Sequence, residues 1–380
     1  MTPGPRPKNG RRARPGAVAS AAGGVVALAF VIAATACSAP GHKPSSPYHH
    51  TTAGFRNPEG SPERQWSWRR LPWILGRLVA SSLDIEPPPN HVVPASEALA
   101  ALYAMKDRDT LTWIGHNTVL LRIGGTTVLT DPWFTDYASP IRPIGPRRYV
   151  PPGIAIEALP PIDVVVISHG HYDHLDLPTI ASLPGRERTT AVVPLGLGRY
   201  FAERGYARVV ELDWFEDTMA AGLKITALPV VHWSKRSVFK TNDTLWAGFA
   251  IERAGGLRIY FGGDAEYGPI YGEITDQYGG FDVGLLSIGA FLPRFVMNGA
   301  HCVPRACIGI ATDLDVHTLV GIHWGTVPLG SDGPLEAATR FREGARGARI
   351  ADDRVWLLKI GETRELRKRP KHAEGRQTGG

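Results

Sequence analysis

Three histidines and one aspartate lie within six residues of one another, directly after an apolar run. They are His169, His171, Asp173 and His174, and the run before them covers 162–167. Imidazoles and carboxylates are costly to gather at a strand end for packing alone, whereas a borderline divalent ion needs such ligands. In a tight loop, one pair can bind one ion while the other pair binds a second. The spacing therefore predicts a site for two zinc ions.

Three further candidate ligands each follow a short run of strand-type residues. They are His232, Asp264 and His323. Gly262 and Gly263 precede the aspartate and allow the backbone to turn sharply beside an ion. Any one of the three could be a hydrogen-bonded loop residue. Their common placement after strands favours a shared role as ligands.

The elements that must position these side chains alternate between strands and helices. Strands are expected at 111–114, 119–123, 126–130, 162–168, 190–193, 208–212, 223–228, 246–251, 258–261, 283–288, 318–322 and 355–358. Helices are expected at 96–105, 177–183, 198–204, 304–314 and 335–342. Gly124 and Gly125 form a two-residue hairpin turn between two of the strands. The alternation predicts a layered α/β sandwich.

A short amphipathic helix is expected between Trp66 and Leu83, interrupted by Pro72. Its apolar residues are interleaved with arginines. Such a helix either lies on a lipid surface or packs on the core through its tryptophans.

The positive charge of the chain lies in its two ends. The net charge is +6, of which residues 1–16 carry +5 and residues 362–380 carry +3, so the remainder is slightly acidic. A basic balance confined to the ends does not indicate a nucleic-acid groove. We expect no nucleic-acid partner.

The first 37 residues have the composition of an export signal. A basic stretch is followed by an apolar, small-residue run that ends at Cys37. This order is typical of a bacterial lipoprotein signal, in which the cysteine is lipidated. We expect an exported protein anchored to the outer face of the cytoplasmic membrane. A secreted or N-terminally anchored protein is the alternative.

The rest of the chain divides into a linker, one large domain and a tail. Residues 38–62 are expected to form a flexible linker and residues 363–380 a disordered basic tail. The domain between them covers 63–362. Cys302 and Cys307 are expected to be incidental thiols.

Many short segments resemble the metallo-β-lactamase superfamily, and within it the branch of N-acyl-phosphatidylethanolamine-hydrolysing phospholipase D. The superfamily motif His-x-His-x-Asp-His is present at 169–174. The narrower branch is indicated by 113–118, 130–132, 138–140, 145–148, 232–236, 245–246, 262–264, 288–290, 293–294 and 323–326. The resemblance runs from about residue 55 to about residue 342. It implies an αββα four-layer sandwich of the metallo-β-lactamase type for the large domain.

The resemblance also implies a ligand set. It places His169, His171 and His232 on one zinc ion. It places Asp173, His174 and His323 on the other, with Asp264 bridging the two. The two ions would share a hydroxide that attacks a phosphodiester. The expected reaction converts N-acyl-phosphatidylethanolamine at a membrane surface to N-acylethanolamine and phosphatidic acid.

Several other residues receive expected roles. Asp173, Asp264 and His301 are assigned to catalysis, with His301 hydrogen bonding the phosphoryl group or protonating the leaving oxygen. A solvated histidine is the alternative for His301. Asp131 and His116 are expected to orient the metal ligands. The residues expected to contact substrate are Arg294, Lys235, Arg236 and Phe291.

Two other functions stay open on the sequence alone. The domain could hydrolyse a different substrate, such as a lactone or a soluble phosphodiester. A non-catalytic zinc-binding surface lipoprotein is less favoured, because structural zinc sites are closed and rich in cysteine. The sequence leaves the oligomeric state open, with a homodimer as one possibility.

Overall fold

The computed structural model describes residues 47–64, 68–80, 85–237 and 239–370, and two seven-stranded sheets form its centre. The first sheet contains β3 (Thr110–Gly115), β4 (Thr118–Ile123), β5 (Thr126–Thr130), β6 (Val164–Val166), β7 (Thr190–Pro194), β8 (Arg208–Leu212) and, beside β3, β16 (Thr363–Glu365). The second contains β9 (Asp217–Ala220), β10 (Leu223–Leu228), β11 (Gly248–Glu252), β12 (Arg258–Phe261), β13 (Phe281–Ser287), β14 (Val316–Ile322) and β15 (Val355–Trp356).

Each sheet is antiparallel at one end and parallel at the other. Strands β5 to β8 run parallel in the first sheet, and strands β12 to β15 run parallel in the second. The carboxyl ends of parallel strands meet at one edge, so the loops after β5, β6, β12 and β14 open there. These four loops carry most of the predicted site residues.

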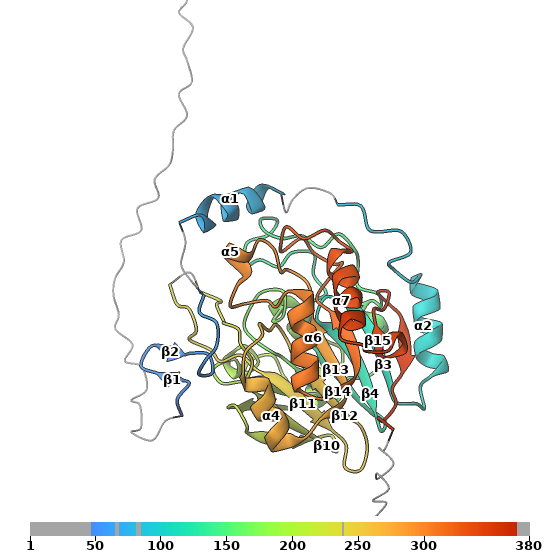
Figure 1. The fold of residues 1–380 in the computed structure, drawn as a ribbon. Helices are drawn as coiled ribbons and strands as arrows, with labels where there is room; N and C mark the ends of the chain where they lie inside the picture. The colour runs from blue at the N-terminus through green and yellow to red at the C-terminus, as the bar shows by residue number, and fades with distance from the viewer. Residues whose placement is uncertain (1–46, 65–67, 81–84, 238, 371–380) are drawn as a thin grey trace, which may run out of the picture. The chain divides into compact units, whose positions relative to one another are not determined.

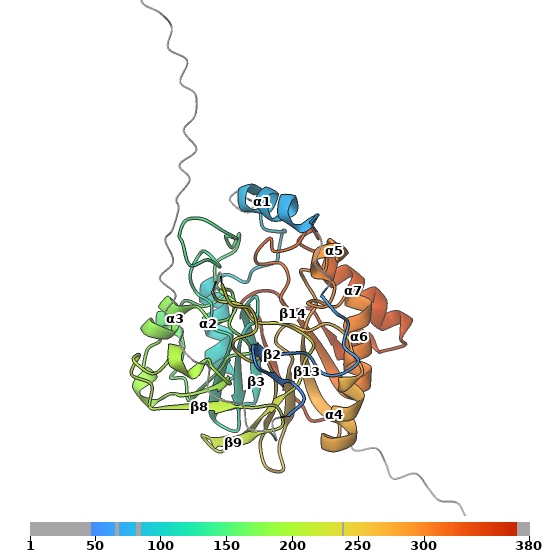
Figure 2. The same ribbon diagram turned by 90° about the vertical axis from the view of Figure 1, so that its left-hand side faces the viewer.

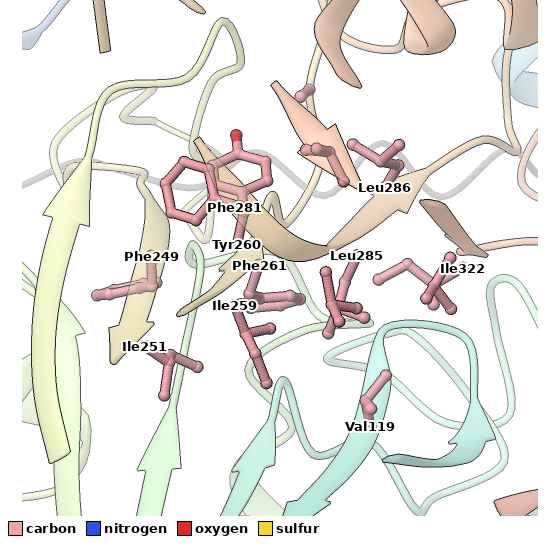
Figure 3. Close-up of a cluster of buried hydrophobic side chains, with 14 of the residues drawn as sticks. Val119, Phe249, Ile251, Ile259, Tyr260, Phe261, Phe281, Leu285, Leu286 and Ile322 are labelled. Atoms are coloured by element: carbon pink, nitrogen blue, oxygen red, sulfur yellow. The ribbon is translucent and has the colours of Figure 1, made fainter. Parts of the chain in front are cut away.

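One apolar core fills the space between the sheets. Val119 of β4 belongs to the same cluster as Phe249, Ile259 and Leu285 of the second sheet (Figure 3). All four side chains are fully buried. Each sheet therefore buries its inner face against the other.

Successive residues of β6 point to opposite faces, as the pleat of a strand requires. Val164 and Val166 lie in the core between the sheets, while Val165 and Ile167 lie in a second cluster on the outer face. Both faces of β6 are buried. This explains why the run before the histidine motif is continuously apolar.

The described α-helices are α1 (Arg70–Ala80), α2 (Ala95–Ala104), α3 (Leu177–Ser182), α4 (Ile270–Tyr278), α5 (Arg294–Met297), α6 (Pro304–Asp313) and α7 (Glu336–Gly347). Helices α1 and α5 lie at the edge of the domain, while the others cover the two outer faces (Figure 2). Figure 2 shows α2 and α3 on one side of the two sheets, and α4, α6 and α7 on the other. Leu102 of α2 packs on the first sheet, and Phe341 of α7 joins the core of the second. The predicted αββα sandwich is confirmed.

The structure differs from the sequence prediction at both ends of the domain. Residues 47–62 do not form an open linker, because β1 (His50–Thr51) and β2 (Gly54–Phe55) pair as a hairpin (Figure 1). Residues 363–365 are not a disordered tail, because they pair with β3 as strand β16. The predicted leader at 1–37 and the last ten residues lie outside the described part of the chain.

Helix α1 also differs from its prediction. Pro72 does not interrupt it, since the proline lies in the first turn, where a missing N–H breaks no helical hydrogen bond. Trp73 packs beside Val296 and Met297, while Leu71 and Leu75 are exposed. No helix in the described ranges has the length and apolar character that a membrane span requires.

Cys302 and Cys307 are not incidental thiols, because the structure joins them in a disulfide. The two do not share a helix. Cys302 precedes α6, which begins at Pro304, so the loop can fold back to bring the two sulfurs together. The disulfide links Cys302, the residue after His301, to helix α6.

Candidate metal centre

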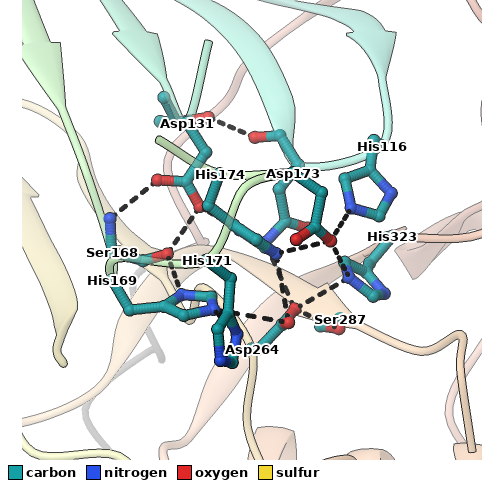
Figure 4. A network of polar contacts seen from close by, with 12 residues as sticks. His116, Asp131, Ser168, His169, His171, Asp173, His174, Asp264, Ser287 and His323 are labelled. Carbon is teal, nitrogen blue, oxygen red and sulfur yellow. Dashed lines mark hydrogen bonds and ion pairs between the residues drawn. The ribbon is translucent and has the colours of Figure 1, made fainter. Parts of the chain in front are cut away.

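The structure brings all seven predicted metal ligands together at the strand edge, in two adjoining groups. Figure 4 labels all of them except His232. The first group is His169, His171, His232 and Asp264. The second is His116, Asp173, His174 and His323. Within each group, one ligand atom from every residue lies within 4.8 Å of the others.

Asp264 lies between the two groups. Its Oδ2 is 3.1 Å from Nε2 of His174, and its Oδ1 is 3.1 Å from Nε2 of His323. The same Oδ2 is 3.8 Å from Nε2 of both His169 and His232. One carboxylate therefore faces imidazoles of both groups, as a bridging ligand would.

The donor atoms fit a divalent metal ion. Nε2 of His171, His174 and His323 are buried and make no hydrogen bond within the described chain, although carboxylate oxygens approach two of them. Buried nitrogens without a partner are rare in native proteins and call for an explanation. Imidazole nitrogens converging with carboxylates form the N/O donor set that zinc takes in catalytic sites.

The backbone at the site adopts conformations that ordinary residues avoid. His116, Asp131 and His323 have φ values of 54°, 33° and 63°, in the left-handed region. Gly263 turns the chain before Asp264 with φ 57°, and a Cβ there would lie 2.4 Å from the Cβ of Ser168. Strain at such positions clusters at functional sites.

In two of the ligand rings, the nitrogen that points away from the centre is held by a neighbouring group. Nδ1 of His174 lies 2.7 Å from Oδ2 of Asp131, and Nδ1 of His232 lies 2.8 Å from the carbonyl oxygen of Ala300. These contacts leave Nε2 of each ring facing the centre. Nε2 of His116 lies 2.8 Å from Oδ2 of Asp173, where it can orient that carboxylate.

Ser168 and Ser287 carry no motif of their own, yet both support the centre. The backbone N–H of Ser168 donates to Oδ1 of Asp131 at 2.7 Å, and its hydroxyl donates to Oδ2 at 2.6 Å. The hydroxyl of Ser287, at the end of β13, donates to Oδ1 of Asp264 at 3.1 Å. The place of each serine at or just beyond the end of a buried strand is the one signal that could have found them.

The carboxylates control the charge of the centre. Burial alone would raise the pKa of Asp264, but His174 and His323 hold it well below its usual range. Burial also opposes a charge on His323, but Asp264 and then Asp173 outweigh it and raise the pKa of His323 to about 9. Burial also opposes a charge on His174, but Asp264, Asp173 and Asp131 raise its pKa well above the usual value. Without metal, protonated His174 and His323 therefore balance part of the negative charge of the carboxylates.

The other imidazoles stay neutral. Burial lowers the pKa of His171 to about 3 and that of His301 to about 4. A neutral imidazole has a lone pair available for a metal ion.

A cavity of about 520 Å³ opens above the centre. Asp173, Asp264, His171 and His301 contribute to its lining. Most of the remaining lining is apolar, including Trp73, Trp233, Val296, Met297 and Leu329. Such a cavity suits a ligand with a small polar group and a large apolar part.

Lys235 and Arg236 line this cavity, as a substrate-binding role requires. Nη1 of Arg236 donates to the carbonyl oxygen of Gly170 at 3.0 Å, and its guanidinium lies over the ring of Tyr172. Both contacts fix this charge next to the metal-ligand loop.

Arg294 and Phe291 differ from their predicted roles. Arg294 forms an ion pair with Glu266 at 2.5 Å and donates to the carbonyl oxygen of His301 at 2.6 Å. Its charge is thus neutralised in a structural contact, and it does not line the cavity. Phe291 is fully buried in the core and has no surface that a substrate could reach.

Arg64 lines the cavity without belonging to any sequence motif. Its guanidinium carbon lies 3.7 Å from the ring centroid of Trp233, and its buried Nε has no hydrogen-bond partner in the described chain. Burial and the neighbouring Arg70 lower its pKa to about 10. A cation in this environment is suited to an anionic ligand.

Comparisons with known proteins agree with this fold. Residues 126–324 match the family model described as the beta-lactamase superfamily domain, so the chain belongs to the β-lactamase superfamily. Its described domain has the metallo-β-lactamase fold and carries residue groups that could hold a metal ion. A possible metal-dependent hydrolase from Veillonella parvula superposes with a TM-score of 0.55 at 19% identity, over 68% of this chain and 100% of that one. At that identity the likeness supports the fold alone.

Two curated relatives are closer in sequence. An uncharacterised protein of Mycobacterium tuberculosis is 42% identical over 227 residues, which cover 58% of this chain and 60% of the relative. The N-acyl-phosphatidylethanolamine-hydrolyzing phospholipase D 1 of Caenorhabditis elegans is 35% identical over 231 residues, covering 58% and 65%. The chain thus spans less than two thirds of the length of either relative.

Proposed function

We propose that this chain is a two-zinc phosphodiesterase that acts as a phospholipase D on membrane phospholipid. The proposed reaction converts N-acyl-phosphatidylethanolamine to N-acylethanolamine and phosphatidic acid. The observation that carries the proposal is the position of Asp264 between two groups of imidazoles, below a cavity with cationic and apolar walls.

The proposed ligand sets follow the two groups. His169, His171 and His232 hold one ion, Asp173, His174 and His323 hold the other, and Asp264 contacts both. When bound, two zinc ions supply a water of lowered pKa and stabilise the charge that develops on a phosphoryl oxygen.

Three cations hold the phosphodiester in this proposal. Arg64, Lys235 and Arg236 all line the cavity, and the first and last are fixed over aromatic rings. Hydrogen bonds between charged groups and phosphate oxygens are short and strong, so these side chains place the phosphorus atom above Asp264.

His301 assists at the leaving oxygen. Its Nε2 lies 3.9 Å from Oδ2 of Asp264, and its Nδ1 is buried without a partner in the described chain. A neutral imidazole can donate one hydrogen bond while its other nitrogen accepts. The ring therefore stabilises a phosphoryl or leaving oxygen that comes within reach.

The cavity rim favours a substrate presented at a lipid surface. Trp73 and Pro140 line the cavity, while their neighbours in sequence, Leu71, Leu75 and Ile141, are exposed. Exposed apolar side chains beside a cavity mouth are suited to contact with lipid. Export through the leader and lipidation at Cys37 would bring this rim to a membrane.

The relative from Caenorhabditis elegans supports the choice of lipid, since its name gives N-acyl-phosphatidylethanolamine as substrate. The decisive assay uses the zinc-loaded chain on vesicles of N-acylated and of plain phosphatidylethanolamine. We expect release of N-acylethanolamine and at least tenfold slower cleavage of the plain lipid. Equal rates on both lipids would overturn the head-group assignment.

A second panel tests the alternative substrates. It contains a small chromogenic phosphodiester and a lactone. Hydrolysis of these compounds without activity on vesicles would replace the phospholipase assignment by a soluble-substrate hydrolase of the same fold.

A further inference from the structure

Two consecutive histidines near the start of the described chain face one carboxylate that the metal centre does not use. Nε2 of His49 lies 2.6 Å from Oδ1 of Asp213, and Nε2 of His50 lies 2.7 Å from Oδ2. His50 begins strand β1, and Asp213 lies between β8 and β9. The contact therefore fastens the N-terminal hairpin to a loop more than 160 residues away.

The two rings converge although they are neighbours in sequence. His49 lies in the turn that leads into β1 and His50 is the first residue of that strand, so the two side chains need not point to opposite sides. Here the ring centroids of His49 and His50 are 4.5 Å apart, and both rings reach the same carboxylate. His49 stacks on Trp214 at 4.2 Å, and the ring of His50 meets Phe55 edge-on at 5.1 Å.

Neighbouring contacts also hold the carboxylate. The backbone N–H of Trp214 donates to Oδ1 of Asp213 at 2.8 Å, while Asp213 Oδ2 faces His50. Packing of His49 and the turn around Asp213 thus position three donor atoms before any ligand arrives. Such preorganisation lowers the cost of binding.

The donor set suits a transition metal. Two imidazole nitrogens and one carboxylate oxygen lie within 4.8 Å of one another. Zinc accepts such ligands and is often held by three protein groups with water completing its coordination. His49 is nearly buried, but the side chains of His50 and Asp213 are 19% and 13% exposed, which leaves a path to solvent.

We propose that His49, His50 and Asp213 form a separate binding site for a divalent transition-metal ion, with zinc as the first candidate. The ion fastens the hairpin β1–β2 to the domain. Its site shares no ligand with the centre around Asp264 and does not depend on the reaction proposed above.

The same segment reaches the metal centre further along the chain. Oδ1 of Asn57 accepts hydrogen bonds from the backbone N–H of His232 at 2.9 Å and from Nε1 of Trp246 at 3.2 Å. A metal ion at His49 and His50 therefore stabilises the segment that supports one of the catalytic-site histidines.

The test counts metal ions on the full-length chain. Wild type and the double variant His49→Gln/His50→Gln are dialysed against low-micromolar free Zn²⁺, and zinc per chain is measured by atomic emission. We expect wild type to bind one ion more than the double variant. His317→Gln, on β14 and outside both sites, is the matched control and should bind as many ions as wild type.

Further variants separate this site from the centre. Asp264→Asn should keep the additional ion, even if its centre retains none, whereas Asp264→Asn combined with the double variant should lose it. Circular dichroism confirms that each variant is folded, and Asp213→Asn provides a variant of nearly unchanged size. Equal zinc counts in folded wild type and double variant would overturn the proposal and leave only imidazole–carboxylate hydrogen bonds at this site.

Discussion

Asp131 lies 2.7 Å from Nδ1 of His174, on the side of the ring away from the metal centre. The other nitrogen of the same ring faces Asp264 at 3.1 Å. One nitrogen thus sets the orientation of the ring, and the other is left for the centre. The carboxylate of Asp131 also increases the basicity of the ring it holds.

Asp131→Asn should weaken metal binding without removing a ligand. We expect zinc affinity to fall by about 10-fold to 100-fold, because the amide cannot supply the negative charge that supports His174. Competition with a chromogenic chelator measures this change. Asp163, directly before β6, accepts a hydrogen bond from the backbone N–H of Thr127, and Asp163→Asn is the control that should keep its affinity. An unchanged affinity in Asp131→Asn would remove Asp131 from the centre.

Zinc affinity should rise with pH between about 6.5 and 9. Metal-free His323 has a pKa of about 9, because the pull of Asp264 and Asp173 exceeds the effect of burial. A histidine must lose its proton before it can bind the metal ion. The zinc affinity should therefore increase about tenfold per pH unit over this range for each ligand histidine that is protonated in the metal-free chain. Calorimetry in buffers of different ionisation enthalpy should detect the released protons. Binding that is independent of pH and releases no proton would contradict this.

The same proton affects the metal-free fold. Since the folded pKa of His323 is raised above 6.5, its contribution to stability is fully present below that pH and is lost as the pH rises through about 9. Urea unfolding of the metal-free chain should therefore show a falling free energy of unfolding over this interval. Zinc-loaded chain should not show this fall.

Arg64→Gln should raise KM for phospholipid vesicles about tenfold with little change in kcat, since a charged hydrogen bond to phosphate contributes about 1.5 kcal/mol or more. Arg56→Gln is the matched control. Arg56 lies over the Tyr48 ring at 3.7 Å, the distance at which Arg64 lies over Trp233, but it is exposed and outside the cavity. Equal KM values for the two variants would exclude a role for Arg64 in binding the phosphodiester.

Reduction of the disulfide between Cys302 and Cys307 should destabilise the domain modestly. The loop it closes is short, so the expected loss in free energy of unfolding is about 2 kcal/mol. Urea titrations with and without reductant measure it, and the Cys302→Ser/Cys307→Ser variant should behave like the reduced wild type and not respond to reductant. If reductant lowered the free energy of unfolding of that variant by the same amount, the effect in wild type would not come from this disulfide.

The grouping of the seven predicted ligands could be foreseen from the sequence, because each of them directly follows a recognisable strand pattern. The motif at 169–174 and the placement of His232, Asp264 and His323 after strands are visible without any structure. Parallel strands then bring these loops to one edge. The alternation of strand and helix patterns along the chain is likewise visible in the sequence, and it was enough to predict a layered α/β sandwich.

Contacts between distant segments could not be read from the sequence. Arg294 resembles a phosphate-binding cation until Glu266 is found beside it. The hairpin at 50–55 has no apolar periodicity that would reveal it in the sequence. It is held by contacts with Asp213 and Trp214, which lie far along the chain. Arg64 lies outside every motif and becomes noticeable only through the cavity it lines.

The most direct test is a titration of metal-free chain with zinc, in which bound metal and hydrolysis of N-acyl-phosphatidylethanolamine are followed together. The His49→Gln/His50→Gln variant is used, so that only the centre around Asp264 is counted. We predict that activity reaches its maximum at two ions per chain. Full activity at one ion, or no dependence of activity on zinc, would contradict a two-metal mechanism.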